Sequence, residues 1–142
     1  MNRLELVQAT GIAAILPLVN GSELEAQSAD EDGPVFELRT YQTPEGKLEP
    51  LLKRFREKET KIFKRLEMPG VAYWTPTDPP LAGRTLVYML KHKSRAVAAA
   101  DWERFRKDPE WIQLKAESEA NGPLVEKHES LFLALTDFSP RL

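Results

Sequence analysis

The sequence has no cysteine, only two histidines and only seven glycines among its 142 residues. Without cysteine there can be no disulfide, no thiolate nucleophile, no iron–sulfur cluster and no zinc site built on sulfur. The basic excess of nucleic-acid-binding proteins is also missing, because 20 Lys and Arg stand against 22 Asp and Glu. The sequence also lacks a phosphate-binding loop, a dinucleotide fingerprint and a Ser-His-Asp order. We therefore expect no nucleic-acid partner and no cofactor.

A metal site is not expected either, because His92 and His128 are far apart and neither belongs to a metal-binding helical motif. A haem held by one of these histidines is the weaker alternative.

The first 33 residues differ from the rest of the chain. Arg3 precedes an apolar run at 11–19 that is too short to cross a bilayer as a helix. Small residues at 26–29 are typical of a signal peptidase site, and an acidic linker follows. We predict an export leader and linker over 1–33, a folded domain over 34–142, and a periplasmic or extracellular location. A retained apolar anchor or a cytoplasmic tail is the alternative, and we expect no membrane contact once the leader is removed.

The remainder alternates between strand and helix patterns. Apolar residues recur at helical spacing after Pro44 up to a stop at 68–70, and again in two stretches that Ser94 and Asp108 are expected to cap. Asp108 is followed by Pro109, a residue favoured in the first helical position. Strands are expected at 35–41, 71–75, 85–90 and 131–135.

The order strand, helix, strand, strand, helix, strand predicts an α+β, ferredoxin-like fold with a four-stranded antiparallel sheet. On the first strand we expect Phe36 and Leu38 to face the helices and Glu37, Arg39 and Tyr41 to face away. With all helices on one face, the other face stays open to water. A second copy that stacks the two open faces into a dimeric α/β barrel is the expected solution, so we predict a homodimer.

The domain resembles the NIPSNAP family of dimeric α/β barrels. The resemblance rests on the strand 36–41, the turn 44–47 and the Trp-x-x-Phe-x-x-Asp-Pro-Glu-Trp stretch at 102–111, and it covers about 35–139. It implies the fold and the dimer more than an activity. Similar barrels include cofactor-independent monooxygenases, haem-degrading enzymes and dehydratases, which share a cleft between the helix layer and the sheet.

Polar ring-bearing side chains are the candidate ligand site in such a cleft. If strands one and three run parallel, the strand ends carrying Tyr41 and His92 meet the starts of strands two and four, which carry Tyr73 and His128. An imidazole near a phenol can bind an enolate or act as a base. The candidate site residues are Arg39, Tyr41, Tyr73, Tyr88, His92 and His128. The structural alternative is a Glu37–Arg39 ion pair in the dimer interior, with both histidines exposed to solvent.

Three functions follow. The first is binding of a small apolar or aromatic molecule, or of a protein partner. The second is a cofactor-independent monooxygenase or isomerase with Tyr41, His92 and Arg39 as polar anchors. The third is an interaction module that uses the basic face of the first helix, where eight Lys and Arg stand against five Glu. Trp102, Phe105 and Trp111 are expected in the core, with ligand stacking by Trp111 as the alternative. Whether the protein is an enzyme stays open.

Overall fold

The computed structural model describes residues 33–142, so the predicted leader and linker lie outside the described residues except for Gly33. One antiparallel sheet has the strand order β2-β3-β1-β4. The strands are β1 (Val35–Gln42), β2 (Gly70–Trp74), β3 (Thr85–His92) and β4 (Lys127–Leu133). The helices are α2 (Leu48–Arg54), the π-helix η1 (Phe55–Glu59), α3 (Thr60–Arg65), α4 (Arg95–Lys107) and α5 (Pro109–Ser118).

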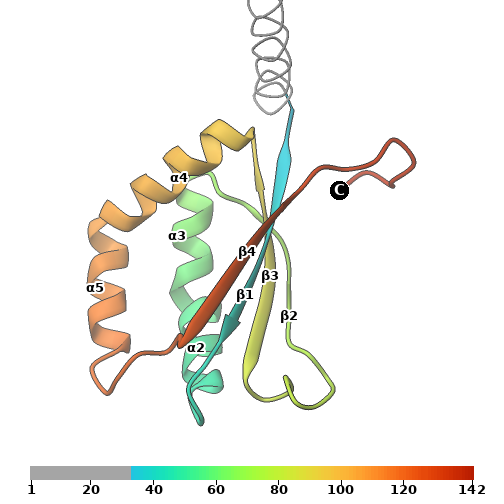
Figure 1. Ribbon diagram of the computed structural model, residues 1–142. Coiled ribbons are helices and arrows are strands. Elements are labelled where there is room, and N and C mark those ends of the chain that lie inside the picture. Colours follow the sequence, from blue (N-terminus) through green and yellow to red (C-terminus); the bar gives the residue numbers. More distant parts are fainter. Residues whose placement is uncertain (1–32) are drawn as a thin grey trace, which may run out of the picture.

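All helices of the described chain lie on one side of the sheet (Figure 1). The element order and the strand order together confirm the predicted ferredoxin-like α+β fold. The end of the chain after β4 extends away from the body (Figure 1), and its Phe138 is 84% exposed.

The helix caps predicted from the sequence are confirmed. The Ser94 hydroxyl accepts a hydrogen bond from the amide of Val97, and an Asp108 carboxylate oxygen accepts one from the amide of Trp111. Asp108 ends α4 in an extended conformation and starts α5 at Pro109, which turns the chain between the two helices.

Two predicted boundaries are wrong. The first helix begins at Leu48 rather than at Pro44, because Gly46 adopts a positive φ of 80° in the intervening turn. The last strand covers Lys127–Leu133 rather than 131–135. Its first four residues are polar, and they pair with β1 at the sheet edge, where a strand needs no apolar run.

The prediction of which face of β1 meets the helices is also wrong. Glu37 and Arg39 contact Trp102 of α4, and Tyr41 packs against Phe55 of η1. These side chains therefore face the helix layer, and the alternating Phe36, Leu38 and Thr40 lie on the other face. Charged side chains are tolerated under the helices because they pair with one another there.

The predicted parallel arrangement of strands one and three is wrong as well. They pair antiparallel, with Val35 opposite His92 and Tyr41 opposite Leu86. Tyr41 and His92 consequently lie at opposite ends of the sheet. The helical crossover between β1 and β2 leaves these two strands running in the same direction, and β3 runs antiparallel to β2, so β3 also runs antiparallel to β1.

Candidate functional site

A buried carboxylate, Glu37, organises the middle of the helix-facing sheet surface. It is 1% exposed and accepts hydrogen bonds from Arg39 at 2.7 Å, Trp102 at 2.7 Å, Ser130 at 2.6 Å and His92 at 2.9 Å. Burial raises the pKa of Glu37, but these hydrogen bonds outweigh it and bring the pKa down to about 2. Glu37 therefore carries its negative charge at neutral pH and serves as a structural anchor.

The imidazole of His92 lies between two carboxylates. Its Nδ1 is 2.9 Å from Asp101 Oδ2 and its Nε2 is 2.9 Å from Glu37 Oε1. Burial lowers the pKa of His92, whereas the two carboxylates raise it, and the net effect is upward. Both ring nitrogens of the protonated form donate, so neither is free to accept a proton from a ligand.

Next to this anchor, Arg39 holds two tyrosine hydroxyls. Its Nε donates to the Tyr88 hydroxyl at 3.0 Å, a terminal nitrogen donates to the Tyr41 hydroxyl at 3.2 Å, and its guanidinium stacks 4.1 Å from the Trp102 ring centre. The Tyr88 hydroxyl donates to that of Tyr41 at 2.8 Å. Burial raises the pKa of both phenols, so both stay protonated.

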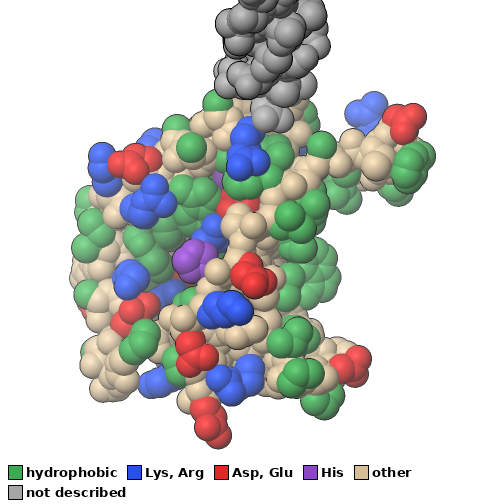
Figure 2. Space-filling model, in the orientation of Figure 1, with side chains coloured by type: hydrophobic (Ala, Val, Ile, Leu, Met, Phe, Trp, Pro, Cys, Tyr) green, Lys and Arg blue, Asp and Glu red, His purple; other side chains and the backbone are tan. Residues whose placement is uncertain are grey.

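A cleft of about 400 Å³ opens between the sheet and the helix layer. Figure 2 shows hydrophobic and Lys or Arg side chains gathered between the helices and β4. The cleft contains phenol and indole rings, four cationic side chains and two carboxylates. Its lining residues are Arg39, Tyr41, Arg54, Glu59, Trp102, Phe105, Arg106, Trp111, Lys115, Glu119, Pro123, Val125 and His128. A concave site with aromatic walls and a few convergent polar groups is typical of small-molecule binding.

A second buried carboxylate, Glu59, reaches this cleft from the π-helix. It is 1% exposed, and its Oε1 accepts a hydrogen bond from Arg54 Nε at 2.9 Å. Burial raises the pKa of Glu59, the adjacent Arg54 lowers it, and the result is about 7. Arg54 also donates to Ser118 and Glu119, which hold it in place. A π-helix inside an α-helical segment is frequent at functional sites.

A family model described as NIPSNAP matches residues 36–140. The chain belongs to the NIPSNAP family. It is similar to an uncharacterized NIPSNAP-like domain protein from Burkholderia xenovorans, with 18% identity, 78% of this chain and 92% of that chain covered, and a TM-score of 0.67. A second NIPSNAP domain protein of that organism has 25% identity, 75% and 99% coverage, and a TM-score of 0.64.

The chain is also similar to a more distant protein, and this similarity concerns the fold alone. A cofactor-independent oxygenase from Streptomyces nogalater has 10% identity, 76% and 98% coverage, and a TM-score of 0.50. No match is found among curated proteins. Family membership therefore establishes the architecture of the NIPSNAP chain, and its chemistry must be argued from the side chains.

The structure brings together some of the predicted site residues but not all. Arg39, Tyr41 and His128 line the cleft, and the Tyr41 and His128 rings are 6.3 Å apart across the β1–β4 pair. Tyr88 lies behind Tyr41 and is fully buried. His92 lies at the other end of β3, so the expectation that it shares the site with Tyr41 is wrong.

Tyr73 is also separated from the cleft. It stacks on the far side of Tyr88, with ring centres 5.5 Å apart, and lines a different hollow of about 240 Å³ with Leu52 and Phe55. The hollow that touches His92, of about 670 Å³, is a further one, lined by Pro34, Lys64, Glu67, Pro69, Lys91, His92 and Lys93.

The structural alternative for these residues is correct in part. The Glu37–Arg39 ion pair exists at 2.7 Å, but it lies under the helices rather than on the open face. His128 is exposed, whereas His92 is 1% exposed. The expectation of a core position is confirmed for Phe105 and Trp111, which are 4% and 9% exposed.

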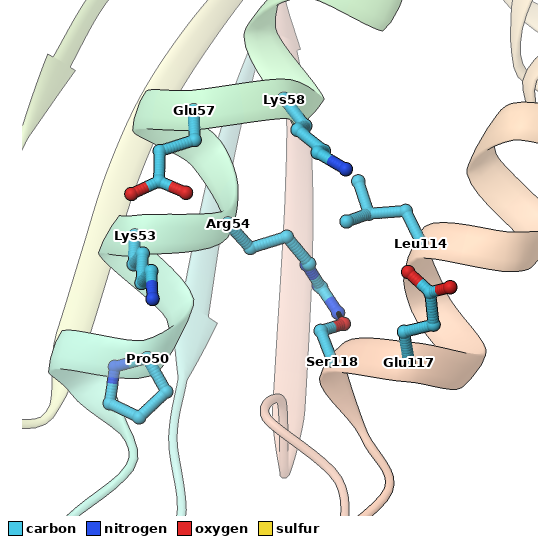
Figure 3. Close-up of a pocket in the computed structure, with 8 residues that line it drawn as sticks. All are labelled: Pro50, Lys53, Arg54, Glu57, Lys58, Leu114, Glu117 and Ser118. Atoms are coloured by element: carbon cyan, nitrogen blue, oxygen red, sulfur yellow. Dashed lines mark hydrogen bonds between the residues drawn. The ribbon is translucent and has the colours of Figure 1, made fainter.

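Three of the eight Lys and Arg on the basic face predicted for the first helix have carboxylate partners among the described residues. Arg54 points inward to Ser118 across a groove of about 300 Å³ between α2 and α5 (Figure 3). Arg65 pairs with Asp108 at 2.8 Å, and Arg56 lies 3.5 Å from Glu49. These pairs cancel only part of the positive charge, so the interaction-module function stays a prediction.

Sequence reasoning missed Glu59 as a site residue, although one pattern could have indicated it. Glu59 lies four residues after Phe55 and three before Ile62, on the same apolar helical stripe. A carboxylate in such a stripe is expected to be buried.

The described residues contain no group of three or more His, Cys, Asp or Glu that could hold a metal ion. No helix among them is long and apolar enough to cross a membrane.

Proposed function

We propose that the NIPSNAP chain binds a small aromatic molecule with an oxygen substituent in the cleft between the sheet and the helices. One observation carries this proposal, the hollow of about 400 Å³ with indole and phenol walls and an Arg39–Tyr41 pair at its base. This volume lies within the range of ligand pockets and suits one or two fused rings. The rings of Trp102 and Trp111 form an aromatic wall of the hollow, and Tyr41 supplies a hydrogen bond.

The Tyr41 hydroxyl is the polar group best placed for such a ligand. It accepts from both Arg39 and Tyr88, which leaves its own proton to donate. An oxygen of a carbonyl, phenol or carboxylate can accept that proton. The oxygenase or isomerase with His92 as an anchor loses its support, because both ring nitrogens of His92 are already bound to carboxylates.

Ligand binding is tested by titrating the full chain with 4-nitrophenol and following tryptophan fluorescence. Two of the three tryptophans, Trp102 and Trp111, line the cleft, so we expect saturable quenching. Tyr41→Phe should weaken binding by roughly tenfold, equivalent to about 1.4 kcal/mol. Tyr73→Phe removes a hydroxyl outside the cleft and should leave the affinity unchanged. Absence of saturation, or equal effects of the two variants, would contradict the proposal.

We further propose that two NIPSNAP chains form a homodimer through the open face of the sheet. This face carries Trp74, 48% exposed, and Leu131, 56% exposed, next to Leu38, Val87 and Met89. Continuous apolar surface of this kind is usually covered by a partner. Leu131→Glu should convert a dimer to a monomer in light scattering after size exclusion, whereas Ile112→Glu on the outer face of α5 should not. A wild-type monomer at micromolar concentration would contradict the dimer.

Export is proposed from the sequence of residues 1–33 alone. If the leader is removed near Ala29, N-terminal sequencing of the protein purified from its own host should begin close to Asp30. Native mass spectrometry of the same sample measures subunit number and any retained small molecule. An intact N-terminus in the cytoplasmic fraction would contradict export.

A further inference from the structure

Glu59 and the Tyr41–Arg39 pair lie on opposite layers of the same cleft. Glu59 comes from η1 in the helix layer, whereas Arg39 and Tyr41 come from β1 in the sheet. All three line the hollow of about 400 Å³. A ring bound between the two layers would therefore have a carboxylate on one side and a hydroxyl donor on the other.

The carboxylate of Glu59 is unusually free for a buried group. Its hydrogen bonds within the described chain use Oε1 alone, with Arg54 as donor, whereas Glu37 uses both oxygens for four donors. Arg54 keeps Glu119 as an ion-pair partner at 3.0 Å. Protonation of Glu59 therefore leaves no buried cation without a counter-charge, and this permits Glu59 to gain and lose a proton in the folded protein.

A side-chain hydrogen bond stabilises the π-helical backbone of η1, the segment from which Glu59 reaches the cleft. The Thr60 hydroxyl donates to the Phe55 carbonyl at 2.9 Å, which satisfies a backbone acceptor of the widened turn. Phe55 in turn packs edge-on against Tyr41, with ring centres 6.1 Å apart. The segment that bears the carboxylate and the strand that bears the hydroxyl are thus packed directly on each other.

We infer that Glu59 is a general base for a cofactor-independent proton transfer on an aromatic carbonyl or phenol-forming substrate, with the Tyr41 hydroxyl holding the oxygen that becomes negative. Glu59 takes a proton from carbon, and the electron pair of that C–H bond moves into the substrate and ends on the oxygen. Tyr41, backed by Arg39 and Tyr88, donates a hydrogen bond to this oxygen. Return of the proton to another carbon completes an isomerisation with no oxidant or cofactor. The inference rests on the proposed ligand binding in the cleft.

The charges around Glu59 are compatible with this role. Burial moves its pKa to about 7, where a base is most effective near neutral pH. The titratable and charged groups that face it or share the cleft with it come from both layers. They are Arg54, Glu119, Lys115 and Arg106 from the helices and Arg39, Tyr41, Tyr73, Tyr88 and His128 from the sheet.

The test uses the full chain and the probe 5-nitrobenzisoxazole. A base removes the hydrogen on its ring carbon, the electron pair forms the nitrile, and the N–O bond breaks to give a coloured phenolate. We expect catalysed release that rises with pH through about 7. Glu59→Gln should lower the rate by roughly 10²-fold or more, and Glu59→Asp should restore part of it. Glu57→Gln, an exposed neighbour in the same π-helix, is the matched control and should not change the rate.

Binding of the same probe is measured in parallel by tryptophan quenching. If the probe binds to wild type and to Glu59→Gln, but the rate is equal in both, the base role is overturned and ligand binding stands. If the probe does not bind at all, both the ligand proposal and the base role are overturned. A residual rate that survives in Glu59→Gln and follows a basic pKa would assign the activity to a lysine instead.

Discussion

Two glutamates between the sheet and the helices, Glu37 of β1 and Glu59 of η1, are equally buried, but their pKa values are shifted in opposite directions. Each is 1% exposed, but the pKa of Glu37 is about 2 and that of Glu59 is about 7. The difference comes from partners, because four donors surround Glu37 and one hydrogen-bonds to Glu59. Burial alone does not decide whether a carboxylate is a structural anchor or a titrating group. Desolvation raises the pKa of both carboxylates, and the number of hydrogen-bond donors that oppose this rise sets the final value.

Removing the charge of Glu37 should have the largest effect. Glu37→Gln leaves Arg39 and His92 buried without their shared counter-charge, and breaking such pairs costs about 3–5 kcal/mol. Urea unfolding at pH 7 measures the loss. Glu45→Gln in the exposed turn before α2 is the control and should leave the free energy of unfolding unchanged. A loss below about 1 kcal/mol for Glu37→Gln would remove the anchor role.

The two carboxylates should give opposite pH dependences of stability. The pKa of Glu37 is lowered from 4.5, so its stabilisation is present above pH 4.5 and is lost as pH falls towards 2. The pKa of Glu59 is raised, so its contribution is present below pH 4.5 and is lost as pH rises towards 7. Each change amounts to about 3 kcal/mol. The free energy of unfolding is measured with urea across pH for wild type and for each Gln variant, and the difference between them gives the contribution of each carboxylate. If the two contributions changed with pH in the same direction, the opposite pKa shifts of Glu37 and Glu59 would be contradicted.

Removing a single donor from Glu37 should have a smaller effect. Trp102→Phe keeps an aromatic ring beside Arg39 but deletes the N–H that lies 2.7 Å from the carboxylate. A hydrogen bond to a charged group contributes about 1.5–3 kcal/mol. We expect a loss in that range by urea unfolding and an upward shift of the Glu37 pKa. No shift of the pKa would show that the indole hydrogen bond is unimportant.

The smallest effect is expected for an exposed glutamate of the same π-helix as Glu59. Glu57→Gln removes a charge that water already solvates, so the free energy of unfolding should change by no more than about 0.5 kcal/mol. Thermal unfolding of Glu57→Gln and Glu59→Gln side by side shows whether position in the helix or burial determines the change in stability. Equal effects would favour position.

Local sequence patterns predicted much of this fold. Ser94 and Asp108 were identifiable as caps because capping depends on residues within one helical turn. The element order and the family followed from strand and helix periods and from the stretch at 102–111.

The site was predictable only in part, because it depends on pairings between distant segments. Alternation on β1 separates two faces but does not say which one meets the helices. The charges of Glu37 and Arg39 indicated a face of β1 turned away from the helices. Only the three-dimensional structure shows that their partners His92 and Trp102 lie on the helix side. The antiparallel pairing of β1 with β3 placed His92 away from Tyr41. Glu59 was hidden among the charges of its helix.

A carbon-13 NMR titration of the glutamate side-chain carboxyls measures the pKa of Glu37 and the pKa of Glu59 in one sample. The resonances are assigned with Glu37→Gln and Glu59→Gln. We expect a titration midpoint near pH 7 for Glu59 and near pH 2 for Glu37 in the same folded protein. A Glu59 midpoint at or below the ordinary value of 4.5 would contradict it.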